Sequence, residues 1–178
     1  MKKTLLSLGA AVMLFTGAKA QETLPALSKG SVMIETSLSP YSMLKTTGFG
    51  FASNDGISEW SVGGEGGYFV ADKFSVKLGL GVLGVTQDFG GGKDTETALS
   101  YKIGAKYYAA NQFPFQVDLG GINSDGENGL LLGVQAGYAW FLKENIALEP
   151  GVRYDHGLND NFSEIKTVSV KLGFSLHF

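Results

Sequence analysis

Few side chains in this sequence have the type and spacing that enzyme chemistry needs. The 178 residues contain two histidines and no cysteine, which excludes a thiolate nucleophile and a zinc–thiolate site. A hydrolase also needs a nucleophile within reach of its base. His156 is the one histidine near a predicted loop, and the serines after it, Ser163 and Ser169, approach it only if the fold brings them back. These residue types predict a protein that is not an enzyme.

Two short motifs resemble ligand-binding loops in their letters alone. Residues 79–84 have the glycine spacing of a dinucleotide-binding turn, which requires a strand, a turn and then a helix, and no helix pattern follows here. Residues 123–128 resemble the start of a calcium loop, but Asn128 stands where that loop needs glycine and Val134 where it needs glutamate. We therefore expect no cofactor and no metal site.

The elements that must position these residues follow a period of two. In the last segment Val168, Val170 and Leu172 alternate with Ser169 and Lys171, so one face is apolar and the other is polar or small. The same alternation predicts eight strands, and no amphipathic helix competes with them. The strands are expected at residues 31–38, 58–70, 73–87, 95–109, 112–121, 129–142, 146–156 and 164–178.

The predicted connections alternate between short and long. Tight turns are expected near residues 71–72, 110–111 and 143–145. The longer, polar connections are residues 39–57, 88–94, 122–128 and 157–163. An up-and-down sheet with these connections has its long loops at one end and its tight turns at the other.

The first 20 residues have the pattern of a secretory signal peptide. Lys2 and Lys3 precede a short apolar run, and small residues at the end of the run predict cleavage between Ala20 and Gln21. The run is too short to span a bilayer as a helix. We therefore expect an exported protein.

The remaining chain is expected to be a short periplasmic segment, residues 21–29, followed by a single β-domain, residues 30–178. Three of the 14 lysines and arginines lie in the leader, which leaves 11 against 17 acidic residues and a net charge of −6. A balance of this sign predicts no binding to nucleic acid.

Three features favour a membrane barrel over a soluble β-sandwich. The predicted strands reach the roughly 9–11 residues that cross a bilayer at a tilt. The long loops and tight turns lie at opposite ends, as they do in outer-membrane barrels. Aromatic residues that would form an interfacial girdle gather beside the tight turns. These residues are Tyr68, Tyr107, Tyr138 and Trp140. Lipid satisfies no backbone hydrogen bond, so the sheet must close into a barrel, and eight is an allowed strand number.

The inward face of an eight-stranded barrel is just wide enough for side chains to fill it. Five acidic and five basic residues share the inward parity, and buried charges persist only when they are paired. We therefore predict a salt-bridge network and a closed lumen. The ten residues are Glu35, Glu65, Lys77, Lys102, Lys106, Asp118, Glu149, Arg153, Asp155 and Lys171.

The last eight residues resemble the C-terminal β-signal of bacterial outer-membrane proteins. The matching positions are Lys171, Gly173, Leu176 and the terminal Phe178. Residues 67–72 also resemble the Gly-Tyr-Phe-x-x-Asp turn of the small eight-stranded outer-membrane barrels, the family of the OmpA transmembrane domain and OmpX.

The resemblance implies an all-β, eight-stranded antiparallel barrel in the outer membrane. It also implies contacts with outer-membrane lipid, and with periplasmic chaperones and the barrel assembly machinery during biogenesis. An extracellular ligand would bind through the loops. Lipid A deacylases among outer-membrane barrels pair a histidine with a serine two residues later, and Leu158 stands at that position after His156.

We expect a non-enzymatic surface barrel that acts structurally or through adhesive loops. A narrow porin-like conduit for small or hydrophobic solutes is the first alternative, and a lipid-modifying enzyme is the second. Within loop 39–57, Phe49 and Phe51 either anchor a partner or extend the sheet beyond the membrane.

Overall fold

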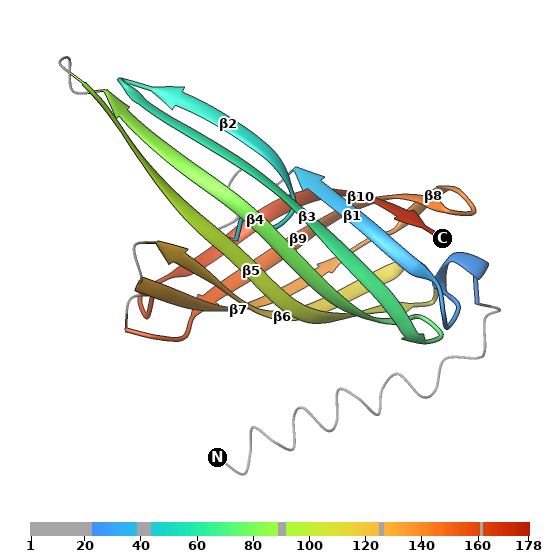
Figure 1. Ribbon diagram of the computed structural model, residues 1–178. Coiled ribbons are helices and arrows are strands. Elements are labelled where there is room, and N and C mark those ends of the chain that lie inside the picture. Colours follow the sequence, from blue (N-terminus) through green and yellow to red (C-terminus); the bar gives the residue numbers. More distant parts are fainter. Residues whose placement is uncertain (1–22, 39–43, 89–91, 125–126, 161) are drawn as a thin grey trace, which may run out of the picture.

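A computed structural model describes residues 23–38, 44–88, 92–124, 127–160 and 162–178, and it is built almost entirely of β-strands (Figure 1). Among these residues, no helix is long and apolar enough to span a membrane. A short 3-10 helix, η1 (Pro25–Leu27), precedes the strands. The strands are β1 (Val32–Leu38), β2 (Gly48–Asn54), β3 (Ile57–Ala71), β4 (Phe74–Asp88), β5 (Lys93–Ala109), β6 (Phe113–Ser124), β7 (Glu127–Gly137), β8 (Trp140–Lys143), β9 (Ile146–Gly157) and β10 (Lys166–His177).

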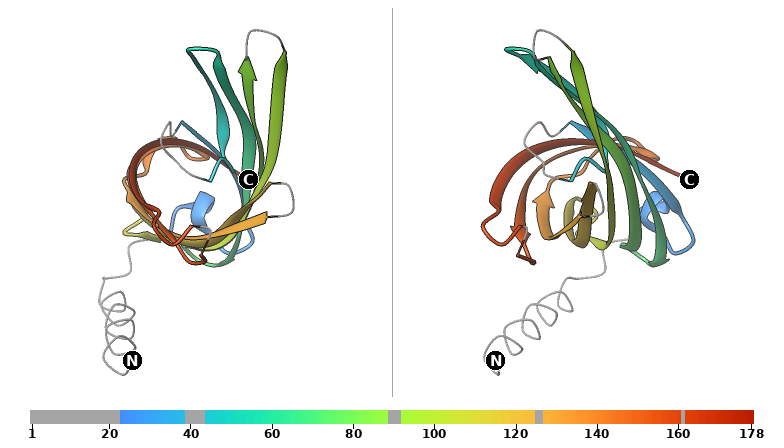
Figure 2. Two further views of the ribbon diagram at one scale, coloured as in Figure 1. Left: turned by 90° about the vertical axis from the view of Figure 1, so that its left-hand side faces the viewer. Right: turned by 60° about the vertical axis from the view of Figure 1, so that its left-hand side comes forward.

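The sheet is antiparallel and closes on itself. β1 pairs with β10 on one side and with the lower part of β3 on the other, which joins the two ends of the strand order. β1 and β2 lie end to end along β3, and β7 and β8 lie end to end along β9. The described strands therefore fill eight positions around a ring, which Figure 2 shows nearly end on. This confirms the predicted eight-stranded antiparallel barrel.

Burial along the strands is the reverse of that in a soluble protein. On β4, Leu80 is 64% exposed, while Lys77 on the opposite face is 1% exposed. On β10, Val168, Val170, Leu172 and Phe174 are likewise exposed, while Ser169, Lys171, Ser175 and His177 between and beyond them are buried. Because side chains alternate across a strand, the period-two pattern alone decides which face looks outward. The outer wall is apolar, as a lipid-facing surface must be.

The structure departs from the predicted elements at three places. In the predicted connection 122–128, β6 continues to Ser124 and β7 begins at Glu127, so most of this connection is strand. Residues 48–54, expected within a loop, form strand β2, which pairs with β3 from Gly48↔Gly63 to Asn54↔Ile57. Asp55 and Gly56 turn between them with φ angles of 45° and 81°, and Asp-Gly is a strong signal for this two-residue hairpin. The predicted strand 129–142 is divided into β7 and β8 at Tyr138–Ala139.

β2 and the adjoining parts of β3, β4 and β5 extend well beyond the ring (Figures 1 and 2). We call this part the projecting sheet. It lies at the loop end of the barrel, while η1, the tight turns and the C-terminus lie at the opposite, turn end. Phe49 and Phe51 were expected either to anchor a partner or to extend the sheet. In the structure they lie on β2 and extend the sheet, and each side chain is 76% exposed.

Candidate functional site: the barrel lumen

The lumen holds the ten charged residues that were predicted to line it. Each is at most 6% exposed, and every acidic side chain among them lies beside a basic one. Burial on this scale is costly for a charge unless it is paired and hydrogen-bonded. The alternation thus places five cations and five anions in one enclosed space, where they neutralise one another.

Glu35 on β1 is the centre of the larger group of ion pairs. Its Oε2 lies 2.7 Å from the Nζ atoms of both Lys77 and Lys106, and its Oε1 contacts Lys171. Lys77 also lies 2.6 Å from Oε2 of Glu65, and Lys106 contacts Glu149. Glu65 in turn contacts Lys102. One carboxylate therefore links cations from three other strands across the barrel.

A second group is built on Arg153 of β9. Its NH1 and NH2 groups donate to the two carboxylate oxygens of Asp118 at 2.8 and 2.7 Å, and its Nε donates to Asp155 at 2.9 Å. Gln116 joins the two groups, because it donates to Asp118 at 2.7 Å and accepts from Lys77 at 3.0 Å. Gly133 makes room for the guanidinium, since a Cβ there would lie 2.0 Å from it.

The turn end of the lumen is closed by an apolar seal that the sequence did not reveal. Leu27 of the N-terminal segment packs into a buried cluster with Met33, Phe69 and Tyr108. The His177 ring lies against Phe69 and Tyr108, and its Nδ1 is 2.9 Å from the carbonyl oxygen of Ala26. The Tyr108 hydroxyl donates to Glu149 at 2.7 Å, so the seal adjoins the ion pairs directly.

The N-terminal segment is therefore packed against the barrel mouth. Its backbone is also fixed to the first tight turn, because the Lys73 amide donates to the Leu27 carbonyl at 2.7 Å and the Lys29 amide donates to Asp72 at 2.8 Å. The predicted signal peptide and its cleavage point at Ala20–Gln21 lie outside the described residues.

Residues 44–47 fold inward from the loop end and lie inside the barrel. Leu44 and Thr46 are buried, and the Thr46 hydroxyl donates to Glu65 at 3.2 Å. The backbone passes so close to the wall that a Cβ at Gly81 would lie 1.9 Å from the carbonyl oxygen of Lys45, and one at Gly63 would lie 2.5 Å from the same atom. The inward glycines form a cradle for this segment in addition to relieving crowding. We call residues 44–47 the inner segment.

The remaining sequence motifs do not form sites among the described residues. Residues 79–84 lie within strand β4, where Gly81 contacts the inner segment. Residues 125–126 of the calcium-like motif lie outside the described residues, and no group of three metal-binding side chains occurs in the described part. His156 stacks on Tyr154 with a centroid separation of 6.3 Å, and its Nδ1 is buried without a hydrogen-bond partner.

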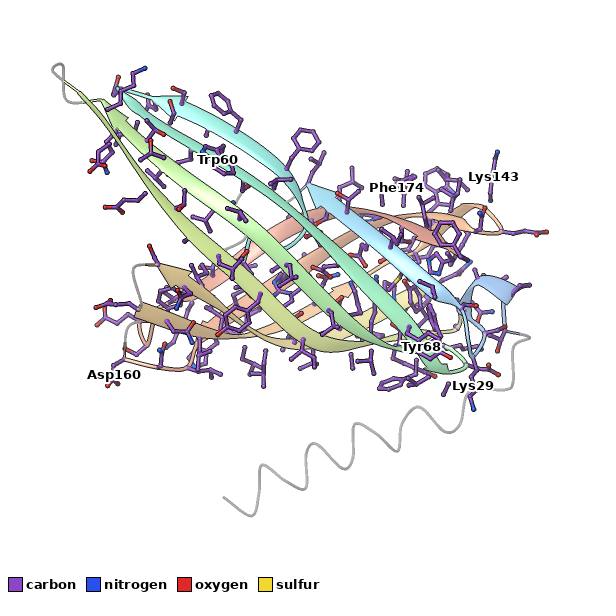
Figure 3. All side chains as sticks on the ribbon, viewed as in Figure 1. Lys29, Trp60, Tyr68, Lys143, Asp160 and Phe174 are labelled. Carbon is purple, nitrogen blue, oxygen red and sulfur yellow. The ribbon has the colours of Figure 1, made fainter. Side chains whose placement is uncertain are left out.

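Aromatic side chains on the outer wall lie at two levels. Tyr68, Tyr138 and Trp140 are exposed at the turn end, and Tyr107 is partly exposed beside them. Trp60, on the projecting sheet, belongs to the other level, well separated from Tyr68 (Figure 3). Phe51 pairs with Trp60 and shares that level. The sequence reading missed this second level because it treated residues 48–54 as a loop.

The β-signal residues lie on the last strand and at the terminus beyond it. Lys171 points into the lumen, while Phe178 is 69% exposed on the outer side. The backbone of Phe178 exchanges two hydrogen bonds with Val32, at 2.8 and 2.9 Å, so the chain end closes the barrel against β1. Recognition of this strand by an assembly machinery stays a prediction.

Comparison with known proteins supports the assignment to outer-membrane barrels. A family model described as Opacity family porin protein matches residues 66–178, more than half of the chain. No curated protein matches. Among solved structures, the N-terminal β-barrel domain of Pseudomonas aeruginosa OprF is 17% identical, with a TM-score of 0.48, and covers 84% of this chain and 98% of its own.

Yersinia pestis Ail in a phospholipid nanodisc is 13% identical, with a TM-score of 0.47, and covers 84% of this chain and 100% of its own. Neisserial surface protein A is 14% identical, with a TM-score of 0.36, and covers 83% of this chain and 94% of its own. At these scores the likenesses carry no further argument. The barrel is established by the strand pairing of this chain.

Proposed function

The chain belongs to the Opacity family of porin proteins and is an outer-membrane β-barrel, and from that premise we propose that it is a non-conducting, non-enzymatic surface protein. Its barrel would anchor the projecting sheet in the membrane. Its interactions would be made by that sheet and the neighbouring loops. The proposal selects the structural or adhesive role over the conduit and the lipid-modifying enzyme.

The filled lumen is the observation that carries the closed-barrel proposal. Three layers lie one after another along the barrel, namely the apolar seal at Leu27, the ion pairs around Glu35 and Arg153, and the inner segment beneath the loops. An aqueous path would have to separate oppositely charged side chains that are buried together, which is costly. This arrangement argues against a conduit.

The projecting sheet supports a role at the cell surface. It presents the 76% exposed rings of Phe49 and Phe51 on an edge strand, beyond the ring of the barrel. Together with their cross-strand neighbours Val62 and Trp60 these rings form a contiguous exposed apolar patch, and such patches mark contact surfaces in proteins. The arrangement around His156 supports the absence of an enzyme, because its cross-strand partners are Leu132 and Lys166, neither of which is a nucleophilic hydroxyl.

Conductance across a planar bilayer tests the closed lumen. Purified barrel should give no steady channels under conditions in which a general porin, reconstituted in parallel, conducts. Steady single-channel currents from the purified protein would contradict the proposal.

Surface action is tested separately by comparing adhesion of cells that display the wild-type barrel or a Phe49→Ser/Phe51→Ser variant. Equal adhesion by both at equal surface levels would count against this use of the sheet.

A further inference from the structure

Two basic side chains, His156 and Lys166, are cross-strand neighbours on the lipid-facing wall near its loop end, and we call this pair the basic step. Strand register places Leu119, Leu132, His156 and Lys166 on one cross-strand row, on neighbouring strands from β6 to β10. All four have the outward parity, so the row is a continuous stripe on the outer surface. It changes from apolar to basic within two strands.

This basic step is unusual for the wall around it. At outward strand positions whose side chains the structure describes, no Asp or Glu occurs, and the only cations besides Lys143 at the turn end are Lys93 on the projecting sheet and Lys166. On β10, the outward residues from Val168 to Phe174 are apolar, and they lead from the turn end of the barrel up to Lys166. Lys166 thus lies where the apolar wall ends on the loop side.

An apolar groove lies on the deeper side of the step. It has a volume of about 360 Å³ and opens between strands β4 to β7. Its outward-facing lining is Leu78, Leu80, Tyr101, Ile103, Leu119 and Leu130. On the outer face, Gly121 lies in one cross-strand row with Leu80, Tyr101 and Leu130. Because Gly121 has no side chain, the groove begins at this position, and the Tyr101 ring lies over it.

The loop side of the groove has a polar rim. The Tyr101 hydroxyl donates to Asn128 Oδ1 at 3.0 Å, and Asn159 Nδ2 donates to the Asn128 carbonyl at 2.6 Å. Asn159 also accepts from the Leu130 amide at 3.0 Å, which fixes the connection after His156 to the groove wall. The surface therefore passes from apolar groove to polar rim to basic step, in the order in which a lipid passes from acyl chain to headgroup.

We propose that the groove and the basic step together bind one phosphate-bearing lipid of the outer leaflet. An acyl chain lies in the groove, and the phosphate lies at His156 and Lys166. Leu119 and His156 are two strands apart, or about 10 Å at the usual cross-strand spacing, which is within the span between the headgroup and the upper part of a chain. Lys166 supplies the positive charge, and a ring nitrogen of His156 donates a hydrogen bond.

The acidic residues nearest this site lie outside the row. Asp155, next to His156, points into the lumen, where it binds Arg153. Asp160 and Glu164 lie in the connection between β9 and β10, and Asp160 is at the loop end of the barrel (Figure 3). The proposal depends on the outer wall only, so it can fail while the closed-lumen proposal stands.

Lipid binding to the purified full chain tests the site. Barrel folded in detergent micelles is titrated with diphosphoryl lipid A, and bound lipid is counted by native mass spectrometry. His156→Gln/Lys166→Gln should weaken binding about tenfold, the loss expected for a charge-assisted contact. Lys143→Gln, which removes an exposed cation at the opposite end of the barrel, should bind as the wild type does (Figure 3).

Two further arms distinguish the lipid from its parts. A dephosphorylated lipid A should bind the wild type about tenfold more weakly and should not respond to the double variant. Inorganic phosphate should not displace the bound lipid, because it lacks the chain that fills the groove. Unchanged affinity in the double variant, an equal loss in Lys143→Gln, or equal binding of the dephosphorylated lipid would each overturn the proposal. All variants are first checked for the heat-dependent gel shift of a closed barrel.

Discussion

The two ends of the lumen are closed by the same means but with opposite chemistry. At each end a non-strand segment folds back into the barrel. At the turn end the contact is made by side chains, with Leu27 against the Phe69 and Tyr108 rings. At the loop end it is made by backbone, with the inner segment lying on Gly63 and Gly81.

The difference teaches how a narrow eight-position barrel accommodates two non-strand segments within its lumen. An apolar plug needs space between large rings, so it fits where the inward positions are aromatic. A backbone plug needs an absence of side chains, so it fits where they are glycine. The ion pairs between the two ends are hydrogen-bonded to both closures. Glu149 accepts from Tyr108 at the turn end, and Glu65 accepts from Thr46 at the loop end.

Removing the charge of Glu35, which lies between the two closed ends of the lumen, should have the largest effect on the stability of the barrel. Glu35→Ala leaves Lys77, Lys106 and Lys171 with one anion fewer, and breaking a buried pair in this way costs about 3–5 kcal/mol. We expect a large drop in the urea midpoint, measured by the gel shift of unboiled samples. Thr36→Ala, on the outer face of the same strand, is the matched control. Equal midpoints for the two variants would show that the lumen charges are solvated.

Truncating Leu27 in the apolar seal should have the second-largest effect on stability. Leu27→Ala removes a fully buried side chain, and such changes cost roughly 2–5 kcal/mol in protein cores. Because the N-terminal segment can leave its site without opening the strands, we expect about 2 kcal/mol or less in the same urea titration. Lys29→Ala, at an exposed position nearby, is the control. A loss as large as that of Glu35→Ala would mean that this seal holds the barrel together.

Filling the glycine cradle should displace the inner segment at a smaller cost. A Cβ at Gly81 overlaps the Lys45 carbonyl, so Gly81→Ala should expel residues 44–47 and expose Lys45 to trypsin. We expect a stability loss of about 1 kcal/mol together with a new cleavage after Lys45, identified by mass spectrometry. Gly64→Ala is the control, because a Cβ there meets nothing within 4 Å. Protection of Lys45 in both variants would contradict the close backbone packing.

The smallest effect is expected outside the lumen, on the projecting sheet. Phe51→Ser changes a side chain that is already 76% exposed, so the free energy of unfolding should change by about 0.5 kcal/mol or less. Phe69→Ser, in the turn-end seal, provides the buried comparison. A large loss in Phe51→Ser would mean that Phe51 is covered by lipid or protein.

The sequence determined the barrel and the membership of its two faces. Alternation is a local property of a strand, so Lys77 and Leu80 could be assigned to opposite faces before any pairing was known. The inward parity also identified all ten charged residues of the lumen. It did not identify their partners, because the contact of Glu35 with Lys106 depends on which strands face one another across the closed ring.

Only the tertiary structure decided what fills the ends of that ring. Residues 24–27 and 44–47 carry no strand periodicity, and their places become favourable only once the closed wall supplies a ring of aromatic side chains or a bed of glycine to receive them. Strand β2 is intermediate, because the Asp55–Gly56 turn signals a hairpin locally, while its extension of the sheet beyond the ring depends on the length of β3 and β4. Local patterns fix what a side chain faces, and long-range closure fixes what it touches.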